Sequence, residues 1–309
     1  MSKTKDRIRD SQLRYKQGLG QNFLYDEDLL AALVEQAGVT AEDDVLEIGP
    51  GSGSMTKHLC ERAHHVLSIE LDERLIPLLS AFMERYDNFT LVQGDVMRLN
   101  LPEVTAGLRR PFSVVANIPY YITTPLITLL LTANLRRPFS VVANIPYYIT
   151  TPLITLLLTA GLPIRQLSLM VQKEVAEKVL SGPGEDGWGM LALRCQYLCE
   201  PRLALDVPAA CFTPPPKVDS AFLVMPLRDK PPVEVRNEED FFRVAQAGFA
   251  LRRKTMTNGL CAAFHMSRED AVSLMTAAGL DDRVRGEKLT MEDLARLADA
   301  YTAYREEHA

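Results

Sequence analysis

An apolar strand that runs directly into three glycines ahead of a helical pattern dictates how the fold begins. Residues 45–53 read VLEIGPGSG. Glycines let the backbone approach a ligand where a Cβ would clash. Their spacing is GxGxG rather than the GxGxxG of dinucleotide sites, and Glu47 lies two residues ahead of the first glycine. The pattern predicts the first strand–turn–helix unit of an α/β fold, with a ligand at the turn.

Strand and helix patterns then alternate along most of the chain, which is typical of a mainly parallel sheet with helices on both faces. The strands are predicted at 44–48, 65–69, 90–93, 166–171, 199–207 and 220–226, and the helices at 28–37, 55–63, 73–85, 173–180 and 191–198. From about residue 230 only helical patterns follow, at 239–250, 254–263, 267–278 and 290–304. We therefore expect an α/β domain over residues 1–229 and a smaller helical domain over residues 230–309.

Acidic residues close the next two predicted strands. A carboxylate at Glu70 can accept both hydroxyls of a ribose, and Asp95 is placed to accept from an adenine amino group. Consecutive strand ends thus direct glycines and acids to one edge of the sheet, where open α/β sheets bind ligands. The combination resembles the signature of S-adenosylmethionine-dependent methyltransferases, so the expected cofactor is S-adenosylmethionine.

Asn-Ile-Pro-Tyr follows an apolar strand twice, at 117–120 and at 144–147. Adenine N6 is a poor nucleophile because its lone pair is delocalised into the ring. The Asn side-chain oxygen and the carbonyl before Pro can accept from the amine and localise that pair, while Tyr offers a stacking face. The candidate acceptor residues are Asn117, Pro119, Tyr120, Asn144, Pro146 and Tyr147.

Several ordered segments make the chain, from about Leu19 to its end, resemble the small-subunit ribosomal RNA adenine N6,N6-dimethyltransferases. These are GQNFL at 20–24, EIGPGSG at 47–53, ELD at 70–72, GD at 94–95, both copies of NIPYYIT, QKEVA at 172–176 and FTPPPKVDS at 212–220.

The resemblance implies a Rossmann-like class I methyltransferase sheet followed by a helical RNA-binding domain. It implies dimethylation of two adjacent adenines in the 3′-terminal stem-loop of small-subunit rRNA during ribosome maturation. The partner would be the immature 30S subunit. It also implies that Phe212 packs on the target adenine, and that the cofactor is contacted by Asn22, Leu24, Gly49, Gly51, Glu70, Asp95 and Asn117 or Asn144.

The chain departs from the family pattern in a tandem duplication. Residues 108–133 are repeated without a change at 135–160, whereas the family has one copy of this strand, turn and helix. The first copy keeps the ordinary distance from Asp95, and the second keeps the ordinary distance to the strand at 166–171. We expect one copy to occupy the sheet and the other to be a displaced insertion.

Composition limits the remaining possibilities. A net charge of −6 excludes a protein that coats nucleic acid over its whole surface, so any RNA contact must be local. Residues 1–16 and Arg252-Arg253-Lys254 are basic patches that alone would indicate solvated surface, and the resemblance implies that they contact phosphates. Five cysteines without a CxxC pair, and a charged N-terminus, favour a cytoplasmic protein without a structural metal. The apolar run 112–134 is broken by Pro119 and Pro125, so no membrane span is expected there. We expect a soluble monomer.

Three other functions remain open. A large-subunit rRNA adenine methyltransferase of the antibiotic-resistance type shares the donor site, but the 212–220 segment and the late helices favour the small-subunit function. A DNA adenine methyltransferase commonly has a Pro-Pro version of the turn and a separate target-recognition domain. An inactive assembly factor, disabled by the duplication, is the alternative outside enzymes.

Overall fold

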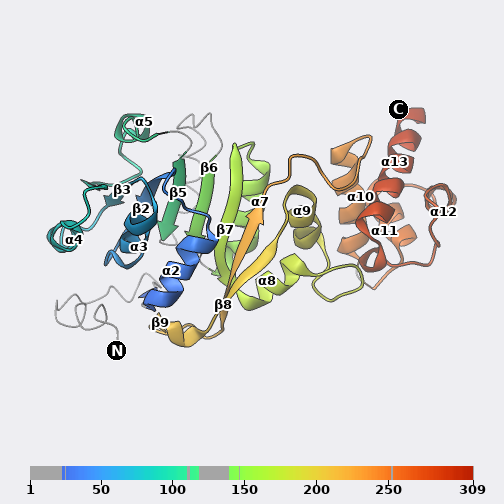
Figure 1. The fold of residues 1–309 in the computed structure, drawn as a ribbon. Coiled ribbons are helices and arrows are strands. Elements are labelled where there is room, and N and C mark those ends of the chain that lie inside the picture. Colours follow the sequence, from blue (N-terminus) through green and yellow to red (C-terminus); the bar gives the residue numbers. More distant parts are fainter. Residues whose placement is uncertain are drawn as a thin grey trace. The chain divides into compact units, whose positions relative to one another are not determined.

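Two compact units make up the chain. The computed structural model describes residues 23–24, 26–109, 112–117, 139–145, 147–251 and 253–308 (Figure 1). Unit 1 consists of Met1–Ala176 and Pro201–Leu227, and unit 2 consists of Glu177–Glu200 and Arg228–Ala309. The expected boundary near residue 229 therefore differs in one segment, because residues 177–200 group with the C-terminal helices.

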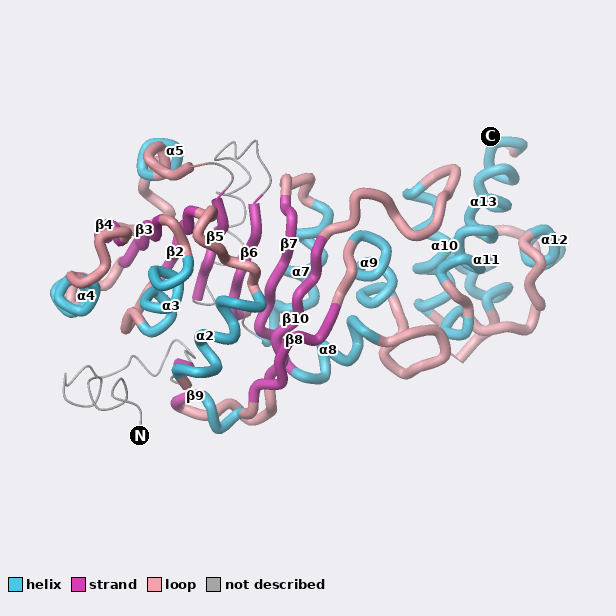
Figure 2. The backbone as a smooth tube through the Cα atoms, in the orientation of Figure 1, coloured by secondary structure: helices cyan, strands magenta, loops and turns pink. Residues whose placement is uncertain are grey.

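Unit 1 is built on an eight-stranded sheet of order β4-β3-β2-β5-β6-β7-β10-β8 (Figure 2). The pairs from β4 to β7 are parallel, and β10 runs antiparallel to β7 and to β8. This confirms the predicted α/β sheet. The strands are β2 (Asp44–Ile48), β3 (His65–Glu70), β4 (Phe89–Gln93), β5 (Phe112–Asn117), β6 (Phe139–Asn144), β7 (Ile164–Gln172), β8 (Arg202–Val207) and β10 (Ser220–Pro226).

The central strands are buried on both faces, which explains their continuous apolar runs. All five residues of β2 are buried. One face packs against Leu30, Leu33 and Val34 of helix α2 and against Leu59 of helix α3. The helices of unit 1 are α2 (Glu27–Gln36), α3 (Ser54–Arg62), α4 (Ile76–Met83), α5 (Leu101–Val104) and α7 (Thr150–Thr159), with the short turns η2 (Tyr147–Ile149) and η3 (Ala209–Cys211). Helix α8 (Lys173–Leu180) begins in unit 1 and ends in unit 2.

Both copies of the duplicated strand lie in the sheet. Strands β5 and β6 are parallel neighbours, and their pairing runs from Val114 with Val141 to Asn117 with Asn144. Val115 and Val142 are only 3% and 5% exposed. The expectation that one copy is a displaced insertion is therefore wrong for the strands. Identical apolar strands are equally suited to a position buried on both faces, so the sheet has widened by one strand.

The apolar run 112–134 begins as strand β5 over Phe112–Asn117, and residues 118–134 lie outside the described residues. Within the part of the chain that the structure describes, no helix is both long and apolar enough to cross a membrane.

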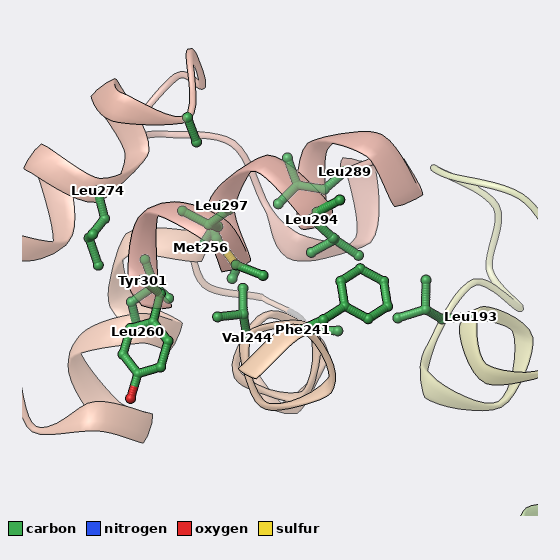
Figure 3. Packing of buried hydrophobic residues seen from close by; sticks show 14 of the residues in the cluster. Leu193, Phe241, Val244, Met256, Leu260, Leu274, Leu289, Leu294, Leu297 and Tyr301 are labelled. Carbon is green, nitrogen blue, oxygen red and sulfur yellow. The ribbon is translucent and has the colours of Figure 1, made fainter. Parts of the chain in front are cut away.

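Unit 2 is a bundle of helices around an aromatic and aliphatic core. Trp188, Leu193 and Tyr197, from residues 177–200, belong to the same buried cluster as Phe241 and Leu294. Figure 3 shows Leu193, Phe241 and Leu294 in this cluster. The Trp188 Nε1–H donates to the carbonyl of Leu289 at 3.1 Å. The helices are α9 (Met190–Leu198), α10 (Glu238–Ala250), α11 (Met256–Phe264), α12 (Arg268–Ala277) and α13 (Met291–Glu307), with the turn η4 (Gly286–Lys288).

Polar caps fix where the four C-terminal helices begin. The side chains of Asn237, Thr255, Ser267 and Thr290 each accept a hydrogen bond from the backbone three residues on. Such caps satisfy amide groups that a helix leaves without intrahelical partners. The cap at Thr255 explains why α11 starts at Met256 rather than at the predicted residue 254.

Replacing Gly286 by Ala is expected to destabilise unit 2 by about 1–3 kcal/mol, because overpacking a tight contact strains its surroundings. A Cβ at this position would lie 2.5 Å from the carbonyl carbon and oxygen of Gly248. Trp188 is the chain's single tryptophan and is buried in unit 2, so its fluorescence in a urea titration measures this unit. Gly182→Ala is the control, because a Cβ at this position would come no closer than 4.0 Å to a neighbouring atom. Equal unfolding midpoints for the two variants would contradict the prediction.

Candidate functional site

The carboxyl ends of β2, β3 and β4 bring the residues predicted to bind the methyl donor to one edge of the sheet. We call this edge, with Gly49, Gly51, Glu70 and Asp95, the donor edge. Ile48 pairs with Ile69, and Glu70 pairs with Gln93. Gly49, Glu70 and Asp95 therefore lie at the ends of three adjacent parallel strands. The edge is the place where open α/β sheets hold their ligands.

The glycine turn has the backbone that only glycine adopts freely. Gly49, Gly51 and Gly53 have φ values of 72°, 59° and 78°. A Cβ on Gly53 would lie 3.1 Å from side-chain atoms of Leu79 and Phe82. The turn is thus a tight cradle just before helix α3, which begins at Ser54.

Glu70 ties this turn to the neighbouring strand. Its Oε2 accepts from the Gly51 N–H at 3.1 Å, and its Oε1 accepts from the Asp72 N–H at 2.8 Å. Glu70 is 6% exposed, and burial raises its pKa above the usual value while these backbone donors oppose the rise. A carboxylate has about four acceptor positions, so Glu70 retains acceptor capacity beyond these backbone donors.

Asp95 shapes the turn after β4. Its Oδ1 accepts from the Met97 N–H at 2.9 Å, and the Arg98 Nε lies 3.6 Å from Oδ2. The Asp95 side chain is 34% exposed, so it is accessible from the edge of the sheet.

Glu47, which precedes the glycine turn in the sequence motif, is a buried acid for which the sequence predicted no separate role. It is 3% exposed, and its Oε2 accepts from the Ser68 hydroxyl at 2.6 Å. Burial raises the pKa of Glu47 to about 7. The signal that could have revealed it is an acid in the middle of an otherwise apolar buried strand.

We expect Glu47→Gln to be more stable than the parent at pH 8 by up to about 3 kcal/mol, and to lose that advantage at pH 4.5 and below. The folded chain keeps the Glu47 proton up to a pKa of about 7, whereas the ordinary value is 4.5. The parent therefore loses stability as the pH rises from 4.5 to 7, and the full cost remains above 7. Gln removes this cost and can still accept from Ser68. Calorimetric unfolding across this pH range measures the difference.

The control for this substitution is Glu42→Gln, at an exposed acid in the loop before β2. A stability difference between Glu47→Gln and the parent that is the same at pH 5 and pH 8 would refute the assigned pKa.

The two Asn-Ile-Pro-Tyr copies end neighbouring strands. Ile48 pairs with Ala116, so the backbone of Asn117 is level with Gly49. Asn144 pairs with Met170 of β7 and lies one strand farther from β2. Tyr147, after β6, forms a hydrogen bond of 2.6 Å through its hydroxyl with the Ser220 hydroxyl at the start of β10. Pro119, Tyr120 and Pro146 lie outside the described residues.

Leu24 and Phe212 meet in a separate two-stranded sheet. Strand β1 (Phe23–Leu24) pairs antiparallel with β9 (Phe212–Thr213), which places Leu24 opposite Phe212. Phe212 is 4% exposed and belongs to the core cluster that contains Val142 and Met170, and Leu24 packs against that cluster. Asn22 lies outside the described residues.

Part of one expected phosphate-binding patch is visible in unit 2. Arg253 and Lys254 are exposed in the loop between α10 and α11. Arg252 and residues 1–16 lie outside the described residues.

The donor edge fits an adenosine-containing ligand. Its glycine turn permits close backbone approach, Glu70 has acceptor capacity for ribose hydroxyls, and Asp95 is accessible to an amino group. A GxGxG turn without a further glycine does not match a pyrophosphate site, and this favours a ligand without phosphates.

Comparison with known families gives one description for the chain. The model of the family described as ribosomal RNA adenine dimethylase matches residues 12–137 and residues 131–303. The two matches overlap inside the duplicated region. The first takes in the first Asn-Ile-Pro-Tyr copy and the second takes in the second copy.

Curated relatives match over nearly their whole length. A protein of Lactococcus lactis named ribosomal RNA small subunit methyltransferase A is 38% identical over 96% of this chain and 94% of its own. A protein of the same name from Clostridium acetobutylicum is 36% identical, over 96% of this chain and 97% of its own.

Solved structures share the fold. The 23S rRNA methyltransferase ErmE is 25% identical with a TM-score of 0.61, over 90% of this chain and 99% of its own. A dimethyladenosine transferase from Plasmodium falciparum is 21% identical with a TM-score of 0.64, over 93% of this chain and 98% of its own.

Proposed function

Because the chain belongs to the ribosomal RNA adenine dimethylase family, we propose that it dimethylates the N6 amines of two adjacent adenines in small-subunit rRNA. The target is the 3′-terminal stem-loop, modified within the immature 30S subunit during ribosome maturation. The chain is a Rossmann-like class I methyltransferase with a C-terminal helical unit, as the sequence predicted. The observation that carries the proposal is the donor edge, where Glu70 braces the glycine turn beside a strand that ends in Asn117.

Each residue of the donor edge is proposed to contact a different part of S-adenosylmethionine. Gly49 and Gly51 give the backbone room, Glu70 accepts from the ribose hydroxyls, and Asp95 accepts from the adenine amino group. Asn22 and Leu24 complete the donor contacts that we propose. When bound, S-adenosylmethionine supplies a methyl group on positively charged sulfur, which the adenine N6 lone pair attacks while the C–S electron pair stays on sulfur and N6 loses a proton to water.

An Asn-Ile-Pro-Tyr turn prepares the target amine. The Asn oxygen and the carbonyl before Pro accept from the N6 hydrogens and localise the lone pair. Tyr provides the apolar surface on which an extruded base stacks. Phe212, which the resemblance assigns to the same role, is 4% exposed within the core cluster and presents little of its ring to a base. Positioning supplies most of the rate, since an activated donor needs no strong general base.

The small-subunit target is favoured over the large-subunit one by degree of similarity. Relatives named small-subunit methyltransferases are 36–38% identical over almost all of the chain, while the 23S rRNA enzyme is 25% identical. Unit 2, with Arg253 and Lys254 exposed, is the proposed RNA-binding unit. We propose that the protein acts in the cytoplasm as a monomer.

A methyl-transfer assay tests the proposed function. Purified protein is incubated with S-adenosylmethionine and immature 30S subunits lacking the modification, in parallel with 50S subunits, and dimethyladenosine is measured in digested rRNA by mass spectrometry. We expect dimethyladenosine only in the small-subunit rRNA. Product confined to 50S subunits, or donor binding without product from any variant of the chain, would overturn the proposal.

A further inference from the structure

The sheet holds two strands where the family pattern has one. On one side β5 pairs directly with β2, whose end carries the glycine turn. On the other side β6 pairs directly with β7, which in turn pairs with β10. In a chain with one copy, a single strand would meet both neighbours, and its Asn-Ile-Pro-Tyr turn would face both halves of the site at once.

The family comparison divides the chain in the same way. One match runs through residue 137 and the other begins at residue 131, so each half of the family pattern is completed by a different copy. The N-terminal match contains Glu70 and Asp95 with Asn117. The C-terminal match contains Asn144 and Tyr147 with Phe212.

The second copy is held to its own half by side-chain and backbone contacts. The Tyr147 hydroxyl bonds to the Ser220 hydroxyl at 2.6 Å, and the Ile145 N–H donates to the Met170 carbonyl at 3.2 Å. These contacts fix the backbone of Asn144, at the end of β6, against β7. Strand β6 is the second strand from β2 in the sheet.

On the basis of the function proposed above, we propose that the first copy, ending at Asn117, serves the methyl donor, and that the second copy is a spacer strand. With this extra strand in the sheet, the Tyr147–Ser220 pair and Phe212 lie one strand farther from the donor edge than they would in a chain with one copy. The duplicated chain therefore binds S-adenosylmethionine but transfers methyl groups slowly.

The size of the displacement decides the expected effect. Neighbouring strands lie about 4.8 Å apart. Reacting atoms must come within about 3–3.5 Å, and a misplacement of about 1 Å costs about 100-fold in rate. One extra strand is thus several times larger than the tolerance of the reaction, whereas the donor contacts on β2, β3 and β4 keep their register.

The experiment compares the full chain with a chain that has one copy. Deleting residues 108–134 or residues 134–160 produces the same polypeptide, because the copies are identical. We expect the single-copy chain to bind S-adenosylmethionine within about twofold of the full chain, measured by calorimetry, and to methylate immature 30S subunits at least 100-fold faster in a single turnover. A full chain that is as fast as the single-copy chain would overturn the proposal.

Donor affinity provides a second measurement that needs neither the deletion nor the RNA. In the full chain, Asn117→Ala is expected to weaken S-adenosylmethionine binding more than Asn144→Ala does, because Asn117 ends the strand beside the glycine turn. The reverse order of losses would overturn the assignment of the copies. A single-copy chain that binds the donor but methylates no small subunit would instead refute the function proposed above, and the affinity order would still decide which copy serves the donor.

Discussion

Glu70→Gln is expected to weaken S-adenosylmethionine binding by about 10- to 100-fold, in line with the roughly 1.5–3 kcal/mol that a hydrogen bond to a charged group contributes. Glu70 accepts from the backbone N–H of Gly51 and of Asp72 with its two different oxygens. An amide has one oxygen, so Gln turns an NH₂ group toward one of these donors. The substitution therefore loosens the glycine turn and removes acceptor positions for the ribose hydroxyls.

Isothermal titration of the donor into the folded variant measures this loss. Glu73→Gln is the matched control, since it makes the same change at an exposed acid three residues along the chain. Both variants should retain the parent's unfolding temperature within a few degrees. If Glu70→Gln binds the donor as tightly as Glu73→Gln, the ribose contact assigned to Glu70 is wrong.

Much of unit 1 was predictable because its signals are local. Strands β2 and β10 and helix α8 have the predicted bounds, since each is an apolar or amphipathic segment between clear turn residues. The glycine turn was predicted from its spacing alone, and the positive φ values confirm it. Helix α4 begins at Ile76 rather than at residue 73, because Pro77 is tolerated only in the first turn of a helix.

The strand pairing of the duplicated segment was not predictable in the same way. Each copy has the pattern of a buried parallel strand, so the sequence offered no local reason to prefer either one. Only the pairing of β5 with both β2 and β6 shows that the sheet accepts both. The bond between Tyr147 and Ser220 likewise joins residues far apart in the sequence, and no short-range pattern indicates it.

The membership of residues 177–200 in unit 2 has a similar cause. Trp188 and Tyr197 pack with Phe241, which lies more than forty residues along the chain. Helix α9 has the same kind of pattern as the helices of an α/β unit, so its sequence does not reveal which core it joins. Long-range packing decides that residues 177–200 belong to unit 2, and no local pattern in the sequence indicates it.

Phe241→Ala is expected to destabilise unit 2 by about 3–5 kcal/mol, the usual cost of removing a buried Phe side chain. Phe241 is fully buried, and Figure 3 shows its ring among Leu193, Leu289 and Leu294. It also stacks on Tyr197 with ring centroids 5.0 Å apart. Removing the ring leaves a cavity between α10 and α9. The surrounding helices can close this cavity only in part.

Urea unfolding followed by Trp188 fluorescence measures this loss in unit 2 itself. Leu251→Ala, at a side chain 38% exposed just after α10, should cost far less because its removal opens no cavity. Phe241→Leu should recover part of the loss, since it refills most of the volume. Because the donor edge belongs to unit 1, folded Phe241→Ala is expected to bind S-adenosylmethionine like the parent while its affinity for immature 30S subunits falls. Equal unfolding midpoints for Phe241→Ala and Leu251→Ala would show that the residues 177–200 do not share a core with α10.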